Sequence, residues 1–145
     1  MRFMMLLKAD KRTEAGELPT KKDIEVMGKF NEELIKAGAL LDAAGLRATS
    51  KGAKVIFQNG KPQVTDGPFA ETKEIIAGYW MIQVKSKDEA ISWAKRVPFD
   101  HLPNAGRLPE IEIRQMFEVT DFPDAPPEIV EQETSFNAAR FGEKK

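Results

Sequence analysis

The chain has 145 residues, no cysteine, one histidine and a formal net charge of −1. This length suits one domain that buries a core without disulfides or metal ions. The lack of cysteine excludes disulfides, thiolate nucleophiles and cysteine-ligated zinc, and the near-neutral charge gives no electrostatic basis for binding nucleic acid or an anionic membrane. No stretch reaches the ~20 apolar residues that span a bilayer. We therefore expect a cytoplasmic protein without a metal or cofactor.

The N-terminal third is predicted to form a strand, a helix and a second strand. Residues 2–8 are a continuous apolar run between charged residues, typical of a central strand. Residues 10–18 are polar and predict a loop. Thr20 then provides an N-cap with an aspartate three positions on, and apolar residues recur at helical spacing until Gly38. Residues 39–47 predict a short strand and a turn.

A hairpin and a long strand are predicted next. Asn59 and Gly60 separate two runs of strand-like sequence, residues 53–58 and 61–65, and Asn-Gly is a strong signal for a two-residue hairpin turn. Residues 74–85 form the longest predicted strand. Its alternation places Tyr79, Met81 and Gln83 on one side and Trp80, Ile82 and Val84 on the other.

The last third predicts a helix, a strand and an extension. Ser86 and Asp88 are possible N-caps for a helix that Pro98 ends, and an irregular loop over residues 99–109 leads to an alternating strand over residues 110–119. Residues 120–145 begin with a proline-containing linker and continue as a short helix over residues 128–140. We expect a domain over residues 1–119 and a C-terminal extension, 120–145, that packs on the body or on a partner subunit.

This order of elements predicts an α+β fold. It is a split β-α-β pattern of the ferredoxin-like type, an antiparallel sheet with an inserted β-hairpin. Two helices would cover one face of the sheet. Because the long strand has bulky apolar residues on both sides, the other face would expose a large apolar patch. We expect a second copy of the chain to cover it, in a homodimer with its sheets face to face.

A turn motif joins the hairpin to the long strand. The run Asp66-Gly67-Pro68-Phe69-Ala70-Glu71-Thr72-Lys73-Glu74 resembles the signature of the DGPF-type branch of the YCII-related family. The likeness runs from Met1 to about Val119 and includes Gly78-Tyr79-Trp80 and Glu112-Ile113-Arg114. The resemblance implies a dimeric α+β barrel.

The resemblance also implies a histidine–aspartate pair, which this chain lacks in its usual form. The histidine position of the family falls on or near Met27, and the usual Asp-Pro after the second helix is Val97-Pro98 here. Either the branch uses a different set of residues centred on Asp66, or the chain binds a molecule without transforming it.

Two residues are candidates for catalysis. Asp66 has the chemistry of a general base or of an acceptor for a polar substrate group, and capping its own turn explains it equally well. His101, the single histidine, titrates near neutrality, and an exposed loop position is the alternative explanation. Substrate-binding candidates are Phe69 as a pocket wall, Glu71 and Glu74 as acid/base partners, Lys73 and Arg47 as anion ligands, and Tyr79 as a hydrogen-bond donor. Ordinary solvation, salt bridges and packing explain these six as well.

The sequence therefore predicts a small-molecule-binding protein whose cleft takes a small polar or carboxylate-bearing ligand. Cofactor-free acid/base chemistry centred on Asp66 is one hypothesis, and whether the chain is an enzyme stays open. Oxygenase-like chemistry would need histidine or metal ligands in the cleft, for which the sequence offers His101. The alternative function is a non-enzymatic binding or regulatory module that acts through its loops and its C-terminal tail.

Overall fold

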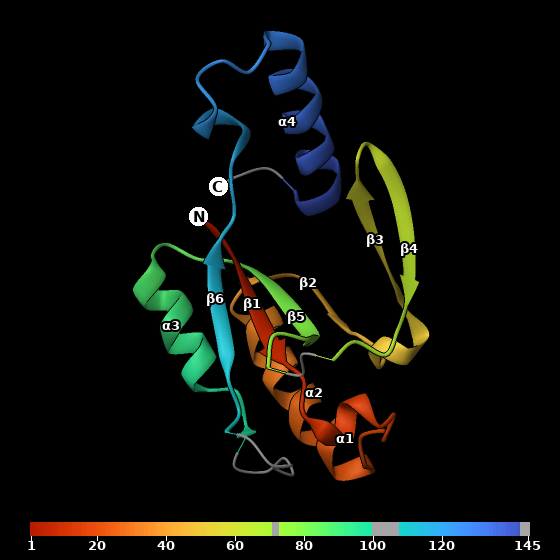
Figure 1. Cartoon of the computed structure of the whole chain (residues 1–145). Coiled ribbons are helices and arrows are strands. Elements are labelled where there is room, and N and C mark those ends of the chain that lie inside the picture. Colours follow the sequence, from red (N-terminus) through yellow and green to blue (C-terminus); the bar gives the residue numbers. More distant parts are fainter. Residues whose placement is uncertain (71–72, 100–107, 143–145) are drawn as a thin grey trace.

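The computed structural model of the chain describes residues 1–70, 73–99 and 108–142. Its centre is a four-stranded antiparallel sheet in the order β2-β5-β1-β6 (Figure 1). The strands are β1 (Arg2–Lys8), β2 (Leu40–Gly45), β5 (Ile76–Gln83) and β6 (Ile111–Gln115). Since β5 pairs antiparallel with both β1 and β2, these two run parallel on either side of it. This order confirms the predicted ferredoxin-like α+β fold.

The two helices that cover the sheet begin at side chains that cap them. Helix α2 (Lys21–Lys36) starts with a capping box, in which Thr20 N donates to Asp23 Oδ2 at 2.9 Å and Asp23 N donates to Thr20 Oγ1 at 3.2 Å. Helix α3 (Lys87–Lys95) starts after Ser86, whose hydroxyl accepts from Glu89 N. Both starts agree with the sequence prediction, because a cap depends on residues only three positions apart.

One helix lies where the sequence predicted a loop. Residues 11–14 form the short helix α1 (Lys11–Glu14), which begins at Asp10. The carboxylate of Asp10 accepts from Arg12 N at 3.0 Å and from Thr13 N at 2.9 Å. The segment is a single turn with no buried residue, so it carries no hydrophobic periodicity that could have revealed it.

The core lies between the sheet and the two helices α2 and α3. Its largest members are Phe3, Met5, Phe30, Leu34, Trp80, Ile82 and Trp93. The ring of Phe30 meets the ring of Trp80 edge to face, with centroids 5.7 Å apart. The predicted alternation in β5 is confirmed, since Trp80 and Ile82 belong to this core. The opposite side of β5, with Tyr79, therefore points away from the helices.

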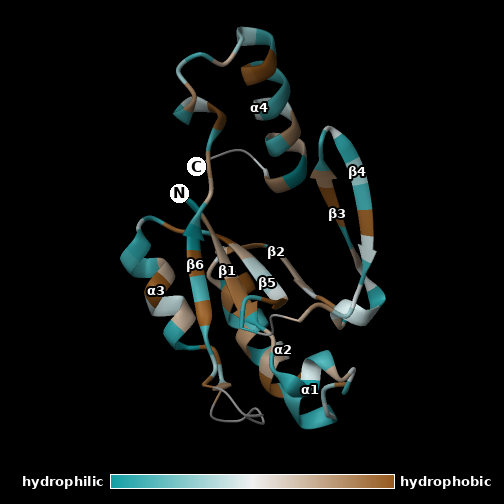
Figure 2. Cartoon of the chain, viewed as in Figure 1, coloured by the Kyte–Doolittle hydropathy of each residue, from teal (hydrophilic) through white to brown (hydrophobic). Residues whose placement is uncertain are grey.

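A hairpin projects from the body as a sheet of its own. Strands β3 (Ala53–Gln58) and β4 (Lys61–Asp66) pair with each other and with no strand of the main sheet. The turn between them has positive φ at Asn59 and Gly60, 53° and 74°, which confirms the predicted hairpin turn. Every residue of both strands is exposed. Figure 2 shows hydrophobic segments on both of these strands.

The C-terminal extension returns to the sheet through its last helical turn. The 3₁₀ helix η3 (Val119–Asp121) leads into α4 (Pro127–Phe141), which projects at the same end of the molecule as the hairpin (Figure 1). Arg2 donates to both carboxylate oxygens of Glu118, at 2.9 and 2.7 Å, and its guanidinium lies 5.7 Å from the ring centroid of Phe141. Arg140 donates to Asp42 at 3.2 Å. Across the described ranges, no helix is both long enough and apolar enough to cross a bilayer.

Candidate functional site

The main cavity has a volume of about 760 Å³ and lies beside the sheet at the end of β1. In the described residues, it is lined by the end of β1, the segment from α1 to α2, the first half of α2 and the connection from β2 to β3, together with Ala77, Phe99, Leu108 and Pro109. Its apolar lining is Leu7, Leu18, Ile24, Met27, Leu46, Phe99 and Leu108. A concave, largely apolar space of this size is typical of small-molecule sites.

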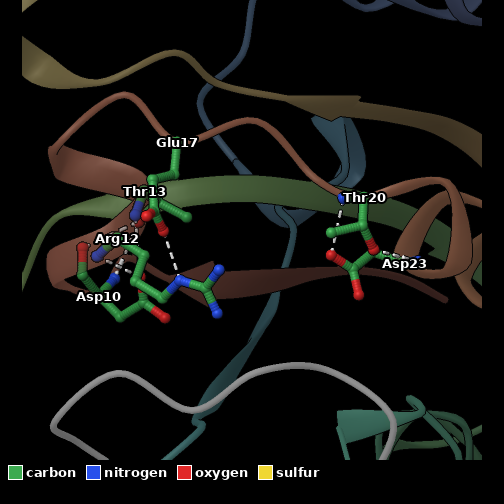
Figure 3. A network of polar contacts seen from close by, with 6 residues as sticks. All are labelled: Asp10, Arg12, Thr13, Glu17, Thr20 and Asp23. Carbon is green, nitrogen blue, oxygen red and sulfur yellow. Dashed lines mark hydrogen bonds and ion pairs between the residues drawn. The ribbon is translucent and has the colours of Figure 1, made fainter.

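The acidic groups of the cavity wall are engaged within the chain. Figure 3 shows Asp10 capping α1, Arg12 donating to Glu17, and Asp23 closing the capping box of α2. The hydrogen bond that Arg12 donates to Glu17 is the largest effect that raises the pKa of Arg12 above its ordinary value. Glu17 is thus paired with a cation, whereas Asp10 and Asp23 accept hydrogen bonds from backbone N–H groups and keep their negative charge.

Two basic side chains of the wall differ from this pattern. Arg47, just beyond the end of β2, and Lys51, in the 3₁₀ helix η1 (Thr49–Lys51), both line the main cavity and are exposed. Neither side chain forms a hydrogen bond or an ion pair with the part of the chain that the structure describes. The cavity is thus bordered by positive charge that is available to a ligand.

A second cavity of about 500 Å³ shares part of this wall. Leu46, Arg47, Ala48 and Lys51 line both cavities. The second cavity also contains Phe69 and Lys54, with the ammonium nitrogen of Lys54 lying 4.3 Å from the centroid of the Phe69 ring. Arg47 therefore lies on the wall between the two spaces.

The turn after β4 fastens the hairpin to the body. Gly67 N donates to the Gly52 carbonyl oxygen at 3.0 Å, and Phe69 N donates to Thr49 Oγ1 at 3.0 Å. Thr49 in turn donates from Oγ1 to a carboxylate oxygen of Glu14 at 2.6 Å. The Gly67–Pro68 peptide bond is cis.

Gly67 is required by its surroundings rather than by its own backbone angles. A Cβ at this position would lie 1.7 Å from the carbonyl oxygen of Thr49 and 2.5 Å from its carbonyl carbon. Real Cβ atoms do not approach backbone atoms so closely, so only glycine fits this contact. In the described residues, the turn after Asp66 therefore holds the hairpin against η1 through the contacts of Gly67 and Phe69. We call this set of contacts the clasp.

The structure brings three of the predicted site residues to a cavity wall. Arg47 lines both cavities, and Phe69 and Glu74 line the second one. Glu74 also forms an ion pair with Lys8 at 3.5 Å. Phe69 and Arg47 thus line cavities, while their roles as pocket wall and anion ligand stay predictions.

Three other predicted residues, Asp66, Lys73 and Tyr79, line neither cavity. Asp66 is the exposed last residue of β4 and lines neither of these two cavities, and Lys73 is also exposed and lines neither. Tyr79 points away from the helices and donates to Asp42 Oδ2 at 3.1 Å, a hydrogen bond that is the first cause of its raised pKa. Glu71 and His101 lie outside the described residues.

Sequence reasoning missed the wall that α2 contributes. Ile24, Met27, Gly28 and Asn31 all line the main cavity. They recur at a spacing of three or four residues, which places them on one face of a helix. That spacing was visible in the sequence, but it did not show that a cavity, rather than the core, lies against this face. Met27 also lies at or near the position where the family resemblance implies a histidine.

The fold and the cavity together define the class. This is a small ferredoxin-like α+β protein with a largely apolar cavity beside its sheet and basic residues at the cavity edge. The model of the YCII-related domain matches residues 1–116, and the chain belongs to this family. The predicted family is thereby confirmed, while the DGPF-type branch stays a resemblance.

A relative supports the family but adds no activity. The chain is similar to an uncharacterized protein of Rhizobium meliloti (strain 1021), with 41% identity over 69 residues. The match covers 48% of this chain and 56% of that relative, so the chain spans little more than half the length of the relative.

Proposed function

We propose that the chain binds small apolar carboxylic acids in the main cavity, with Arg47 as the ligand of the carboxylate. The observation that carries this proposal is the position of Arg47: this exposed residue lines the cavity, and its side chain forms no ion pair in the described chain. The acidic groups of the same wall are engaged elsewhere, as Asp10, Glu17 and Asp23 show. In the described chain, Arg47 and Lys51 are thus basic wall residues whose charge no hydrogen bond or ion pair engages.

The chemistry of arginine suits this role. The planar guanidinium binds a carboxylate through two parallel hydrogen bonds, and it remains charged over the whole physiological pH range. The apolar lining would bury the body of the ligand, which contributes affinity in proportion to the apolar area removed from water. A molecule with one acidic end and one apolar end matches both parts of the site.

The test compares 4-phenylbutanoate with 4-phenylbutanamide, which has the same apolar body without the charge. Isothermal titration calorimetry is expected to show tighter binding of the acid. Arg47→Ala should weaken binding of the acid about tenfold to a hundredfold, as expected for a hydrogen bond to a charged group, and leave the amide unchanged. Arg114→Ala is the matched control, because Arg114 is an exposed strand arginine away from both cavities. Equal binding of acid and amide would contradict the proposal.

Acid/base catalysis centred on Asp66 stays a prediction, and ligand binding does not depend on it. Because Asp66 lines neither cavity, Asp66→Asn is expected to leave the affinity for 4-phenylbutanoate unchanged. Conversion of a bound acid by the wild-type protein, lost in the Asp66→Asn protein, would support the catalytic hypothesis. Loss of binding in that variant would contradict our placement of the site.

We also propose that a second copy of the chain covers the sheet face opposite to the helices. Alternation places Met4 and Leu6 of β1 on this face, next to Tyr79 and Met81 of β5. Light scattering is expected to give the mass of a dimer, and Leu6→Lys is expected to give a monomer with an unchanged circular dichroism spectrum. Phe57→Lys on the hairpin is the control for adding one charge. A wild-type monomer at micromolar concentration would contradict this proposal.

A non-enzymatic interaction module is the second candidate function, and the hairpin favours it. Alternation and cross-strand pairing place Val55, Phe57 and Val64 on one side of the hairpin, with exposed fractions of 54%, 75% and 70%. Such contiguous apolar exposure is typical of interaction sites. A double variant, Phe57→Ser with Val64→Thr, is expected to lose binding to a protein partner while its affinity for 4-phenylbutanoate stays unchanged. Truncation after Val119 would separate a role of the tail from that of the hairpin.

A further inference from the structure

One face of α2 combines a fixed polar group with an open space. Gly28 and Asn31 are three positions apart, so they lie next to each other on the helix surface, and both line the main cavity. Their apolar neighbours Ile24 and Met27 line it as well. Asn31 is thus a neutral polar side chain in an apolar part of the wall.

The core fixes the orientation of the Asn31 amide. The indole nitrogen of Trp80 donates to Asn31 Oδ1 at 2.8 Å. An indole N–H is only a donor, so the oxygen end of the amide must face Trp80. Asn31 Nδ2 forms no hydrogen bond within the described chain, and it is not a buried atom without a partner. Its N–H donors therefore have no partner in the described chain and belong to a residue that lines the cavity.

Helix formation does not explain why residue 28 is a glycine. It lies inside a helix of 16 residues and its φ is not positive, and a glycine at such a position is unfavourable compared with alanine. A Cβ added there would meet no heavy atom within 4 Å. Neither packing nor backbone conformation excludes a side chain, so what glycine provides is free space beside Asn31.

We propose that Asn31 donates a hydrogen bond to an acceptor oxygen of the ligand and that Gly28 keeps the space for that oxygen. This inference rests on the proposed function and narrows it. The ligand is an oxo acid: its carboxylate binds at Arg47, its carbonyl oxygen accepts from Asn31 Nδ2, and its apolar body lies against Ile24, Met27 and Leu46.

The test adds 4-oxo-4-phenylbutanoate to the two probes above. It differs from 4-phenylbutanoate by the carbonyl alone, so the ratio of their dissociation constants reports the Asn31 interaction, while the ratio of acid to amide reports Arg47. The wild-type protein is expected to bind the oxo acid about fivefold more tightly than 4-phenylbutanoate, as for one net hydrogen bond. Asn31→Asp keeps an oxygen for Trp80 but lacks the donors, and it should abolish this preference. Because both probes are acids, repulsion by the new charge cancels in the ratio.

Two further variants separate recognition from folding. Gly28→Ala is expected to raise the melting temperature, because alanine favours the helix, and to weaken binding of the oxo acid more than binding of 4-phenylbutanoate. Trp80→Phe removes the group that orients Asn31 without changing a residue of the cavity wall, and it should reduce the same ratio. A role in stability alone would leave the ratio unchanged in both variants.

The outcomes are distinguishable. Equal affinity for the two acids, or an unchanged preference in Asn31→Asp, would overturn the role of Asn31 while leaving the role of Arg47 intact. Equal affinity for acid and amide, or no binding of any probe at millimolar concentration, would overturn the proposed function and this inference with it. A Gly28→Ala protein that binds the oxo acid like the wild type would overturn the role of Gly28.

Discussion

The contact between Gly67 and η1 makes a sharp prediction for Gly67→Ala. The added methyl group would meet the carbonyl oxygen and carbonyl carbon of Thr49, at 1.7 and 2.5 Å in the unrelaxed structure. Both are backbone atoms, so rotating a side chain cannot relieve the overlap. The turn must move away from η1, and this movement breaks the hydrogen bonds from Gly67 N to the Gly52 carbonyl oxygen and from Phe69 N to Thr49 Oγ1.

The cost can be estimated from its parts. Overlap in a packed site costs about 1–3 kcal/mol, and each lost hydrogen bond costs about 1 kcal/mol. The sum is about 3–5 kcal/mol. However, the hairpin is a separate sheet whose residues are all exposed, so it can detach from η1 while the main sheet stays folded. We therefore expect the loss to appear as local opening.

Hydrogen exchange measures this local opening directly. The amides of Gly67 and Phe69 should exchange at least a hundredfold faster in Gly67→Ala, since about 3 kcal/mol corresponds to a factor of about 100. The amides of Phe3 and Met5 in the central strand should change little. Limited proteolysis within the hairpin should accelerate in parallel.

Gly52→Ala is the matched control. A Cβ at Gly52 would lie 3.7 Å from the same oxygen of Thr49, which is ordinary van der Waals contact, and Gly52 has an extended backbone. This variant should keep wild-type exchange at Gly67 and Phe69. If Gly67→Ala exchanged like Gly52→Ala, the clasp between the hairpin and η1 would be refuted.

Two titrations test the electrostatics of the sheet. Tyr79 is the only tyrosine, so tyrosinate absorbance reports it alone. The pKa of Tyr79 is raised above 10.0 by the hydrogen bond to Asp42, by burial and by the charge of Asp42, while the charge of Arg140 lowers it. Asp42→Asn should therefore lower the pKa of Tyr79, and Arg140→Gln should raise it. Burial lowers the pKa of Lys8, but Glu112 and Glu74 outweigh this and raise it above 10.5. Because the pKa of Lys8 is raised on folding, its protonated form stabilises the fold below about pH 10.5, and this stabilisation is lost as the pH rises through the raised pKa. The urea midpoint should therefore fall more steeply with pH in that range for the wild type than for Lys8→Met. Parallel plots of urea midpoint against pH for the two proteins would contradict this.

The sequence by itself determined the features that depend on residues close in the chain. Thr20 and Asp23 set the start of α2, Asn59 and Gly60 set the hairpin, and the order of strands and helices set the ferredoxin-like fold. The cap and the hairpin turn act over a few residues, because caps and turns are closed by local hydrogen bonds, whereas the order of elements is a pattern along the whole domain. The Asp66 turn was also recognised from the sequence, but not what it contacts.

Only the tertiary structure decided which residues share the cavity. Arg47 follows β2 and Asn31 lies in α2, yet both line one space that also includes the end of β1. The contact that excludes any side chain at Gly67 joins η1 to the turn after β4, at Thr49 and Gly67, which are 18 positions apart. No local pattern encodes such distances, because they follow from how the sheet packs against its helices and where the loops then end. The pocket is therefore a property of the packed molecule, while its individual elements are properties of the sequence.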